Sequence, residues 1–171
     1  MKRIFWVLLV CVILISLAAC SSSSAENESA EPEVSTSAST ESVAERFSYS
    51  VYLPNDNADG FDVTTVCAEE LSAETVLTEL KNRSVLPDMV SVNSFRMDIG
   101  LITVDFNQAF ADAVCSTGTS GELMIVGSVV NTFLDAFQAE SLFFTVEGQI
   151  LESGHTVYDF PLSSFSLDSQ S

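Results

Sequence analysis

The chain has 171 residues, of which 47% are hydrophobic, and it carries 24 acidic side chains against six basic ones, a net charge of −18. A nucleic-acid-binding face needs clustered lysines and arginines, so this balance excludes nucleic acid as a partner. The length is sufficient for one ordinary domain with a hydrophobic core.

The N-terminal segment has the layout of a secretory signal peptide. Two basic residues precede an apolar run over residues 4–15, which is shorter than the roughly 20 residues of a transmembrane helix. The sequence Leu-Ala-Ala-Cys at 17–20 resembles the lipobox of bacterial lipoproteins, in which the cysteine is lipidated and the chain is cut before it. We therefore expect residues 1–19 to be a lipoprotein signal peptide. We expect Cys20 to carry a lipid, the only bound group predicted, which anchors the protein on the extracytoplasmic face of the cell membrane. A plain signal peptide cut at the same place is the alternative.

Residues 20–45 are predicted to be a disordered, acidic and serine-rich tether. After Cys20, its only larger apolar residues are Val34 and Val43. Two such residues bury too little apolar surface to offset the conformational entropy that the segment would lose on ordering. Without the signal peptide the chain keeps four basic and 24 acidic side chains, a net charge of −20. Anionic headgroups repel such a chain, so the lipid alone must provide the anchor. We assign residues 46–167 to one domain and residues 168–171 to a disordered tail.

Hydrophobic periodicity and turn chemistry divide the domain into strands and helices. Extended segments are predicted at 47–53, 61–67, 90–97, 101–107 and 141–148, with a final edge segment at 155–162. Helices are predicted at 73–83, where Ser72 is the N-cap, and at 122–138, with a short helical turn at 108–114. This order predicts an α+β fold, in which two main helices pack on one small, mostly antiparallel sheet.

Three segments, taken in order, resemble the GerMN domain, a family named for a spore germination and sporulation protein. They are residues 102–110, 127–137 and 142–148. The matching positions are Val104, Asp105, Phe110, Asn131, Thr132, Val146 and Gly148. The resemblance covers roughly the whole domain. It implies a cell-envelope lipoprotein whose domain is similar to the ring-building-motif folds of secretion and sporulation complexes, without catalytic residues.

Each matching residue also has a structural interpretation. Val104 and Phe110 are expected in the core, and Asp105 could cap the short helix that follows its strand. Asn131 and Thr132 lie on or beside the polar side of the long helix, where they could bond to a neighbouring strand or loop. We expect these positions to be structural rather than to form a binding site.

Few residues suggest catalysis or metal binding. His155 is the only histidine, and neither a Gly-x-Ser-x-Gly motif nor zinc-ligand spacing accompanies it, so we predict no enzyme and no metal site. The loop at 54–60 carries calcium-loop residues but Val66 stands where the bidentate glutamate is needed, which indicates a turn. Cys67 and Cys115 could form a disulfide in an oxidising compartment, or remain as buried apolar thiols. The sequence leaves both readings open.

These observations predict a lipid-anchored envelope protein with a non-catalytic domain. The domain would mediate contacts with envelope proteins or with itself, in sporulation or germination. The alternative is an extracytoplasmic binding module for a small ligand or a cell-wall polymer, which would require an aromatic-lined pocket. A contiguous apolar surface patch would favour docking.

Overall fold

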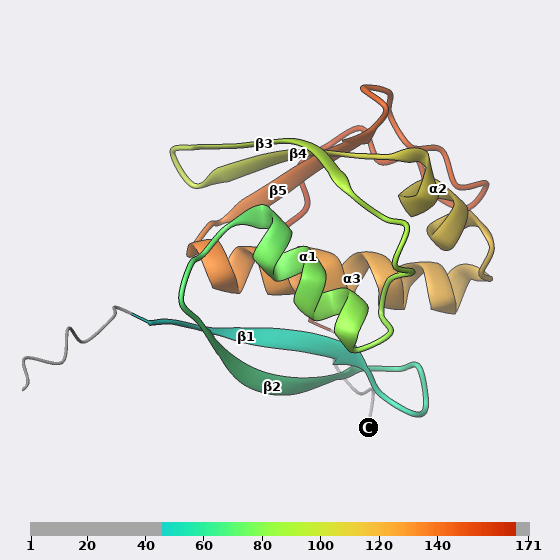
Figure 1. The fold of residues 1–171 in the computed structure, drawn as a ribbon. Coiled ribbons are helices and arrows are strands. Elements are labelled where there is room, and N and C mark those ends of the chain that lie inside the picture. Colours follow the sequence, from blue (N-terminus) through green and yellow to red (C-terminus); the bar gives the residue numbers. More distant parts are fainter. Residues whose placement is uncertain (1–45, 167–171) are drawn as a thin grey trace, which may run out of the picture. The chain divides into compact units, whose positions relative to one another are not determined.

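The computed structural model describes residues 46–166. Its elements follow the order β1 (Phe47–Pro54), β2 (Phe61–Ala68), α1 (Ala73–Asn82), β3 (Val92–Asp98), β4 (Leu101–Phe106), α2 (Gln108–Cys115), α3 (Thr119–Phe137) and β5 (Ser141–Val146) (Figure 1). The predicted signal peptide, the lipidation site, the tether and the tail lie outside the described residues. Between residues 46 and 166, no helix combines the length and the apolar character needed to cross a membrane.

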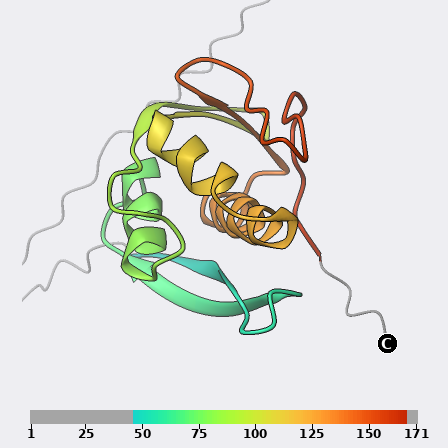
Figure 2. The same cartoon turned by 90° about the vertical axis from the view of Figure 1, so that its right-hand side faces the viewer.

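The strands form two sheets, with α3 lying between them (Figures 1 and 2). β1 and β2 make an antiparallel hairpin, and β3, β4 and β5 make a second sheet in that order. The α+β class is thus confirmed, but the single sheet that we predicted is divided in two. The physical reason lies in α3, which buries residues around most of its circumference, including Ser128 and Thr132. A helix that is buried on more than one side needs a layer on each.

The three-stranded sheet mixes both kinds of strand pairing. β3 and β4 are antiparallel and joined by the two-residue loop Ile99–Gly100, whereas β4 and β5 are parallel. Parallel strands need a long crossover connection. Here α2 and α3 provide it. Burial alternates along β4 and β5, so one face of the sheet packs on the helices and the other lies outward.

Local sequence signals place most element boundaries. Ser72 caps α1 as expected, because its Oγ accepts a hydrogen bond from the backbone N–H of Thr75 at 3.1 Å. The loop at 54–60 joins β1 to β2 as the predicted turn. α3 begins at Thr119, three residues earlier than predicted, and the backbone N–H of Glu122 closes this added turn by donating to the carbonyl of Gly118 at 2.9 Å. The predicted final edge segment at 155–162 forms no continuous strand, because only Val157 and Leu162 make isolated bridges, to Glu152 and Leu142.

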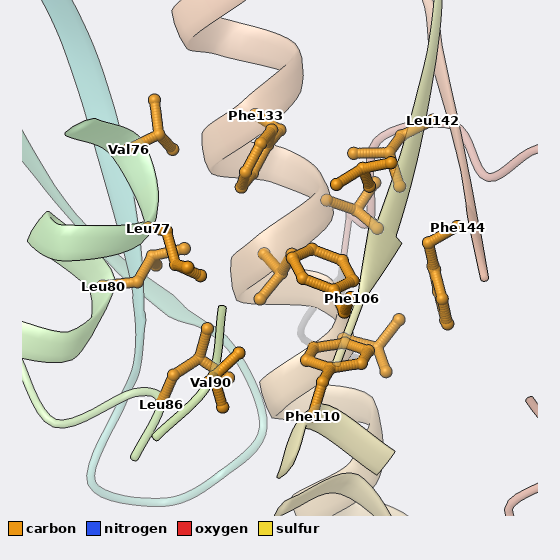
Figure 3. Close-up of a cluster of buried hydrophobic side chains, with 14 of the residues drawn as sticks. Val76, Leu77, Leu80, Leu86, Val90, Phe106, Phe110, Phe133, Leu142 and Phe144 are labelled. Carbon is orange, nitrogen blue, oxygen red and sulfur yellow. The ribbon is translucent and has the colours of Figure 1, made fainter. Parts of the chain in front are cut away.

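Aromatic rings form the centre of the core (Figure 3). Phe106 stacks on Phe110 with ring centroids 4.4 Å apart, and Phe144 meets Phe110 edge-on at 5.4 Å. Phe133 of α3 lies edge-on to Phe106 at 6.3 Å. All four side chains are at most 2% exposed. The sheet, α2 and α3 are therefore joined by one aromatic cluster.

Candidate functional site

Asp105 lies half-buried in β4 and accepts three hydrogen bonds. Its Oδ1 accepts from the hydroxyl of Thr145 at 2.5 Å and from the backbone N–H of Gly148 at 2.7 Å. Its Oδ2 accepts from Nδ2 of Asn93 at 3.1 Å. Burial by itself raises the pKa of Asp105, but these hydrogen bonds outweigh it and hold the pKa below its usual range. One carboxylate thus ties β4 to β3, to β5 and to the turn after β5.

The expectation that Asp105 caps the following helix is wrong. Side chains alternate along β4, so Asp105 lies on the outer face while Phe106 points inward toward α2. Asn107 is the N-cap of α2 and makes no side-chain cap bond there. The first N–H of α2, that of Gln108, instead donates to Oε1 of Glu147 at 3.0 Å. No local sequence pattern indicates this cap, because Glu147 is 39 residues away from Gln108.

Gly148 occupies a turn that requires left-handed backbone. Glu147 and Gly148 have φ values of 50° and 72°, and the flanking Val146 and Gln149 exchange two backbone hydrogen bonds of 2.9 Å. Two successive positive φ values are typical of a type I′ turn, which favours glycine at its second position. The turn also presents the Gly148 N–H to Asp105, so the two matching positions work together.

Polar side chains of α3 bind backbone N–H groups along the edge of β1 that does not pair with β2. Oγ1 of Thr132 accepts a hydrogen bond from the backbone N–H of Tyr52 at 3.1 Å, and Oδ2 of Asp135 accepts one from that of Ser50 at 2.6 Å. These strand N–H groups have no partner in β2, so the helix side chains satisfy them. Thr132 is fully buried. Its predicted bond to a neighbouring strand is confirmed, whereas Asp135 was not singled out from the sequence.

Asn131 binds the C-terminal segment in the way that a strand would. Its Nδ2 donates to the carbonyl of Phe165 at 2.9 Å, and its Oδ1 accepts from the N–H of the same residue at 2.7 Å. Asn131 is 4% exposed, so both bonds are shielded from water. The amide therefore fixes the last described residues against α3 and is structural.

Glu122 is a buried carboxylate that sequence reasoning did not identify. Its Oε1 accepts hydrogen bonds from the hydroxyls of Ser153 at 2.6 Å and Tyr158 at 2.7 Å. Burial, and then the bond to Glu122, raise the pKa of Tyr158 far above its usual range. A buried glutamate is rare without partners. Only its position in the first turn of a helix was visible in the sequence. It joins α3 to the segment after β5.

The remaining matching positions belong to the core. Val104 and Phe110 are fully buried, and Val146 is 5% exposed. All three lie in the hydrophobic cluster between the three-stranded sheet and the helices. The structural interpretation of these apolar positions is confirmed.

Both readings of the cysteines are wrong. Cys67 and Cys115 are free and exposed, so they neither pair nor fill the core. Cys67 lies near the end of β2, and Cys115 ends α2 beside the other sheet (Figure 1). A disulfide needs Cα atoms within about 7 Å. The separation of the two sheets by α3 prevents this. Burial, Glu122 and Asp112 raise the pKa of Cys115.

We expect maleimide to modify both thiols in the folded protein. Peptide mapping after native labelling should find adducts on Cys67 and Cys115, and prior treatment with a reductant should not increase either yield. Because its pKa is raised, Cys115 has little thiolate at neutral pH, so its labelling should be slow there and should become faster as the pH approaches the pKa. Protection of both cysteines until reduction would contradict the assignment.

His155 lies in the segment after β5, two residues from Ser153. It is exposed, and its backbone N–H donates to Oγ of Ser153 at 3.2 Å, while that hydroxyl itself is bound to the carboxylate of Glu122. The structure records no hydrogen bond between the His155 imidazole and a serine or cysteine in residues 46–166. Over the same residues, no group of three His, Cys, Asp or Glu side chains gathers in a way that could hold a metal ion.

A recess in the described part of the chain lies at the C-terminal end of α3. It has a volume of about 680 Å³ and lies between Tyr52, Asn131, Asp135, Glu140 and Phe165. Asn131 and Asp135 already bind backbone groups of the chain itself. The recess therefore offers two aromatic side chains, while two of its polar side chains are already committed within the domain.

These observations define the class: an α+β domain in which the polar side chains at the matching positions hold strands, turns and chain ends together. A family model named Germane and described as sporulation and spore germination matches residues 50–152, more than half of the 171 residues. The chain therefore belongs to this family, and the resemblance to GerMN domains is confirmed.

Solved structures show similar domains. The first GerMN domain of the sporulation protein GerM from Bacillus subtilis has a TM-score of 0.49 and 19% identity, covering 68% of this chain and 96% of its own. The tandem GerMN domains of the same protein have a TM-score of 0.43 and 15% identity, and the match covers 70% of this chain and 45% of theirs. A protein from Clostridium perfringens, described as a predicted lipoprotein, has a TM-score of 0.42 and 12% identity, and the match covers 71% of this chain and 89% of that one. The chain thus spans less than half of the tandem-domain chain. No curated protein matches it.

Proposed function

We propose that this protein is held by a lipid on Cys20 at the extracytoplasmic face of the cell membrane, and that its domain binds other envelope proteins during sporulation or germination. The lipobox-like sequence at 17–20 supports the anchor, and membership of the sporulation and spore germination family supports the process. The domain acts by contact rather than by catalysis.

The observation that carries this proposal is the use of polar side chains inside the domain. Asp105, Asn131, Thr132 and Glu122 all bind other parts of the same domain. A ligand-binding pocket usually needs convergent polar groups that are free to bind the ligand. In the recess near Asn131, the amide of Asn131 and the carboxylate of Asp135 are not free in this way, because both bind backbone groups of the chain itself. The outer surface is therefore the better candidate for function than a pocket.

The surface has apolar side chains available for contact. Large hydrophobic residues that are at least 40% exposed occur on both sheets, at the tip of the β3–β4 hairpin, in the connection between α1 and β3 and on the segment after β5. They are Phe47, Val63, Met89, Met97, Ile99, Ile150, Val157 and Phe160. Exposed apolar residues contribute most to binding when a partner buries them fully.

Changing Cys20 to Ala should move the protein from the membrane fraction to the soluble fraction. The acidic chain has no other source of membrane affinity in this proposal, and a lipidated cysteine carries enough acyl chain for firm anchoring. Fractionation of cells followed by immunoblotting measures the change. Cys67→Ala is the matched control and should remain in the membrane fraction. Retention of Cys20→Ala in the membrane would contradict the anchor.

Cross-linking of the lipidated protein in growing and in sporulating cells tests the contact function. We expect defined protein adducts that are more abundant in sporulating cells and less abundant when Phe110→Ala destabilises the domain. Absence of protein adducts at both stages would contradict the proposal, and a bound small molecule or wall fragment in the purified domain would favour the alternative.

A further inference from the structure

Ile99 occupies an unfavourable position at the tip of the β3–β4 hairpin. Its side chain is 98% exposed, and its backbone has a φ of 44°. Left-handed backbone is disfavoured for L-residues and is an outlier for a β-branched one. A fully exposed isoleucine also leaves its apolar surface in water. Both the backbone conformation and the exposed apolar side chain of Ile99 therefore cost free energy. At this exposure the side chain makes no packing contacts within the domain that would offset these costs.

The loop itself does not require isoleucine. Ile99 and Gly100 have φ values of 44° and 76°, which fit a two-residue type I′ turn. Asparagine is strongly favoured at the first position of such turns. Glu147 stands at the equivalent position of the turn after β5, but its carboxylate caps α2. Gln138 also has a positive φ, and its side chain bonds to the carbonyl of Asp135. Ile99 has no such bond.

Backbone hydrogen bonds fix the base of the β3–β4 hairpin loop. The carbonyl of Gly100 accepts hydrogen bonds from the N–H groups of Glu140 at 2.8 Å and Ser141 at 3.1 Å. The strand pairing continues to Asp98 and Leu101, directly beside the loop. Figure 1 shows the tip projecting from the end of the sheet. A side chain presented on a fixed, projecting turn loses little freedom on binding.

The charge around Ile99 limits what can bind it. Asp98 precedes it, and Glu140 packs against Gly100. The described residues carry 17 acidic and four basic side chains, a net charge of −13, and Lys81 and Arg83 are paired with Glu74 and Glu79. A second copy and an anionic bilayer would both be repelled. A basic protein surface would be attracted.

We propose that Ile99 is the anchor with which the domain docks into an apolar pocket of a protein partner, and that lysines or arginines of the partner surround this pocket and face Asp98 and Glu140. This inference rests on the proposed contact function and specifies its surface and the chemistry of the partner. Met97, 43% exposed and two residues before Ile99, extends the apolar contact with an adaptable side chain.

The first test compares stability with binding. Ile99→Asn should raise the melting temperature of the protein by about 2–4 °C, because asparagine suits the turn. The same variant should weaken binding to the purified partner at least tenfold, because the anchor is lost. Val63→Thr, an exposed β-branched residue on the other sheet, is the control and should change neither quantity by that much. Unchanged binding by Ile99→Asn would overturn the proposal.

The partner is identified by a photo-reactive amino acid placed in the full-length protein in cells, at position 99 and, separately, at 63 and 160. The proposal requires a protein adduct from position 99 whose cross-linked segment is net basic. Adducts from position 99 to lipid, to a second copy or to an acidic segment would overturn it. Protein adducts from 63 or 160 with none from 99 would overturn the anchor but leave the contact function intact. No protein adduct from any position would contradict both.

Discussion

Replacing Phe110 with alanine should lower the free energy of unfolding by about 3–5 kcal/mol, the range for large-to-small changes of buried aromatic residues. Phe110 is fully buried on α2, stacks on Phe106 and meets Phe144 edge-on. Removing its ring leaves a cavity between α2 and the three-stranded sheet. It also removes the aromatic contacts, which contribute beyond buried area.

Urea unfolding followed by circular dichroism measures this change. Phe110→Leu keeps most of the volume and should cost clearly less than Phe110→Ala. Phe160→Ala is the exposed control, since that side chain is 51% exposed, and should have a much smaller effect. If Phe110→Ala and Phe160→Ala were equally stable, the position of Phe110 in the core would be wrong.

Asp105→Ala should lower the free energy of unfolding by about 2–3 kcal/mol at neutral pH. The change removes a charged acceptor of three hydrogen bonds and leaves the Gly148 N–H without its partner. Because these donors lie on β3, on β5 and in the following turn, the loss should also loosen the edge of the sheet. Hydrogen exchange at Gly148 should become faster. Thr103→Ala, a half-buried neighbour on the same face of β4, is the control.

The contribution of Asp105 should depend on pH. Its pKa in the folded protein is held below the unfolded value of about 3.9. Its contribution is therefore fully present above that unfolded value and is lost as the pH falls through the lower folded pKa. The difference in unfolding free energy between the natural protein and Asp105→Asn should be larger at pH 7 than at pH 3. An equal difference at both values would show that the carboxylate charge is not stabilised in the folded protein.

Local patterns were informative wherever a residue and its partner lie close in the chain. Alternation predicted the strands, and Ser72 predicted the start of α1, because its partner Thr75 is three residues away. Patterns failed where partners are distant. Asp135 binds Ser50 across 85 residues, and Glu122 binds Tyr158 across 36. No local periodicity distinguishes such a residue from an exposed acidic one.

The sequence by itself determined the α+β class, the family and the approximate places of the helices and strands, because backbone preferences and hydrophobic periodicity act over a few residues. Only the tertiary structure decided that α3 separates two sheets, that Cys67 and Cys115 lie apart, and that Asp105 joins three strands instead of capping α2. Only the tertiary structure also showed that Ile99 is both exposed and strained. These features depend on which faces meet in space, and that choice is made by packing of the whole core.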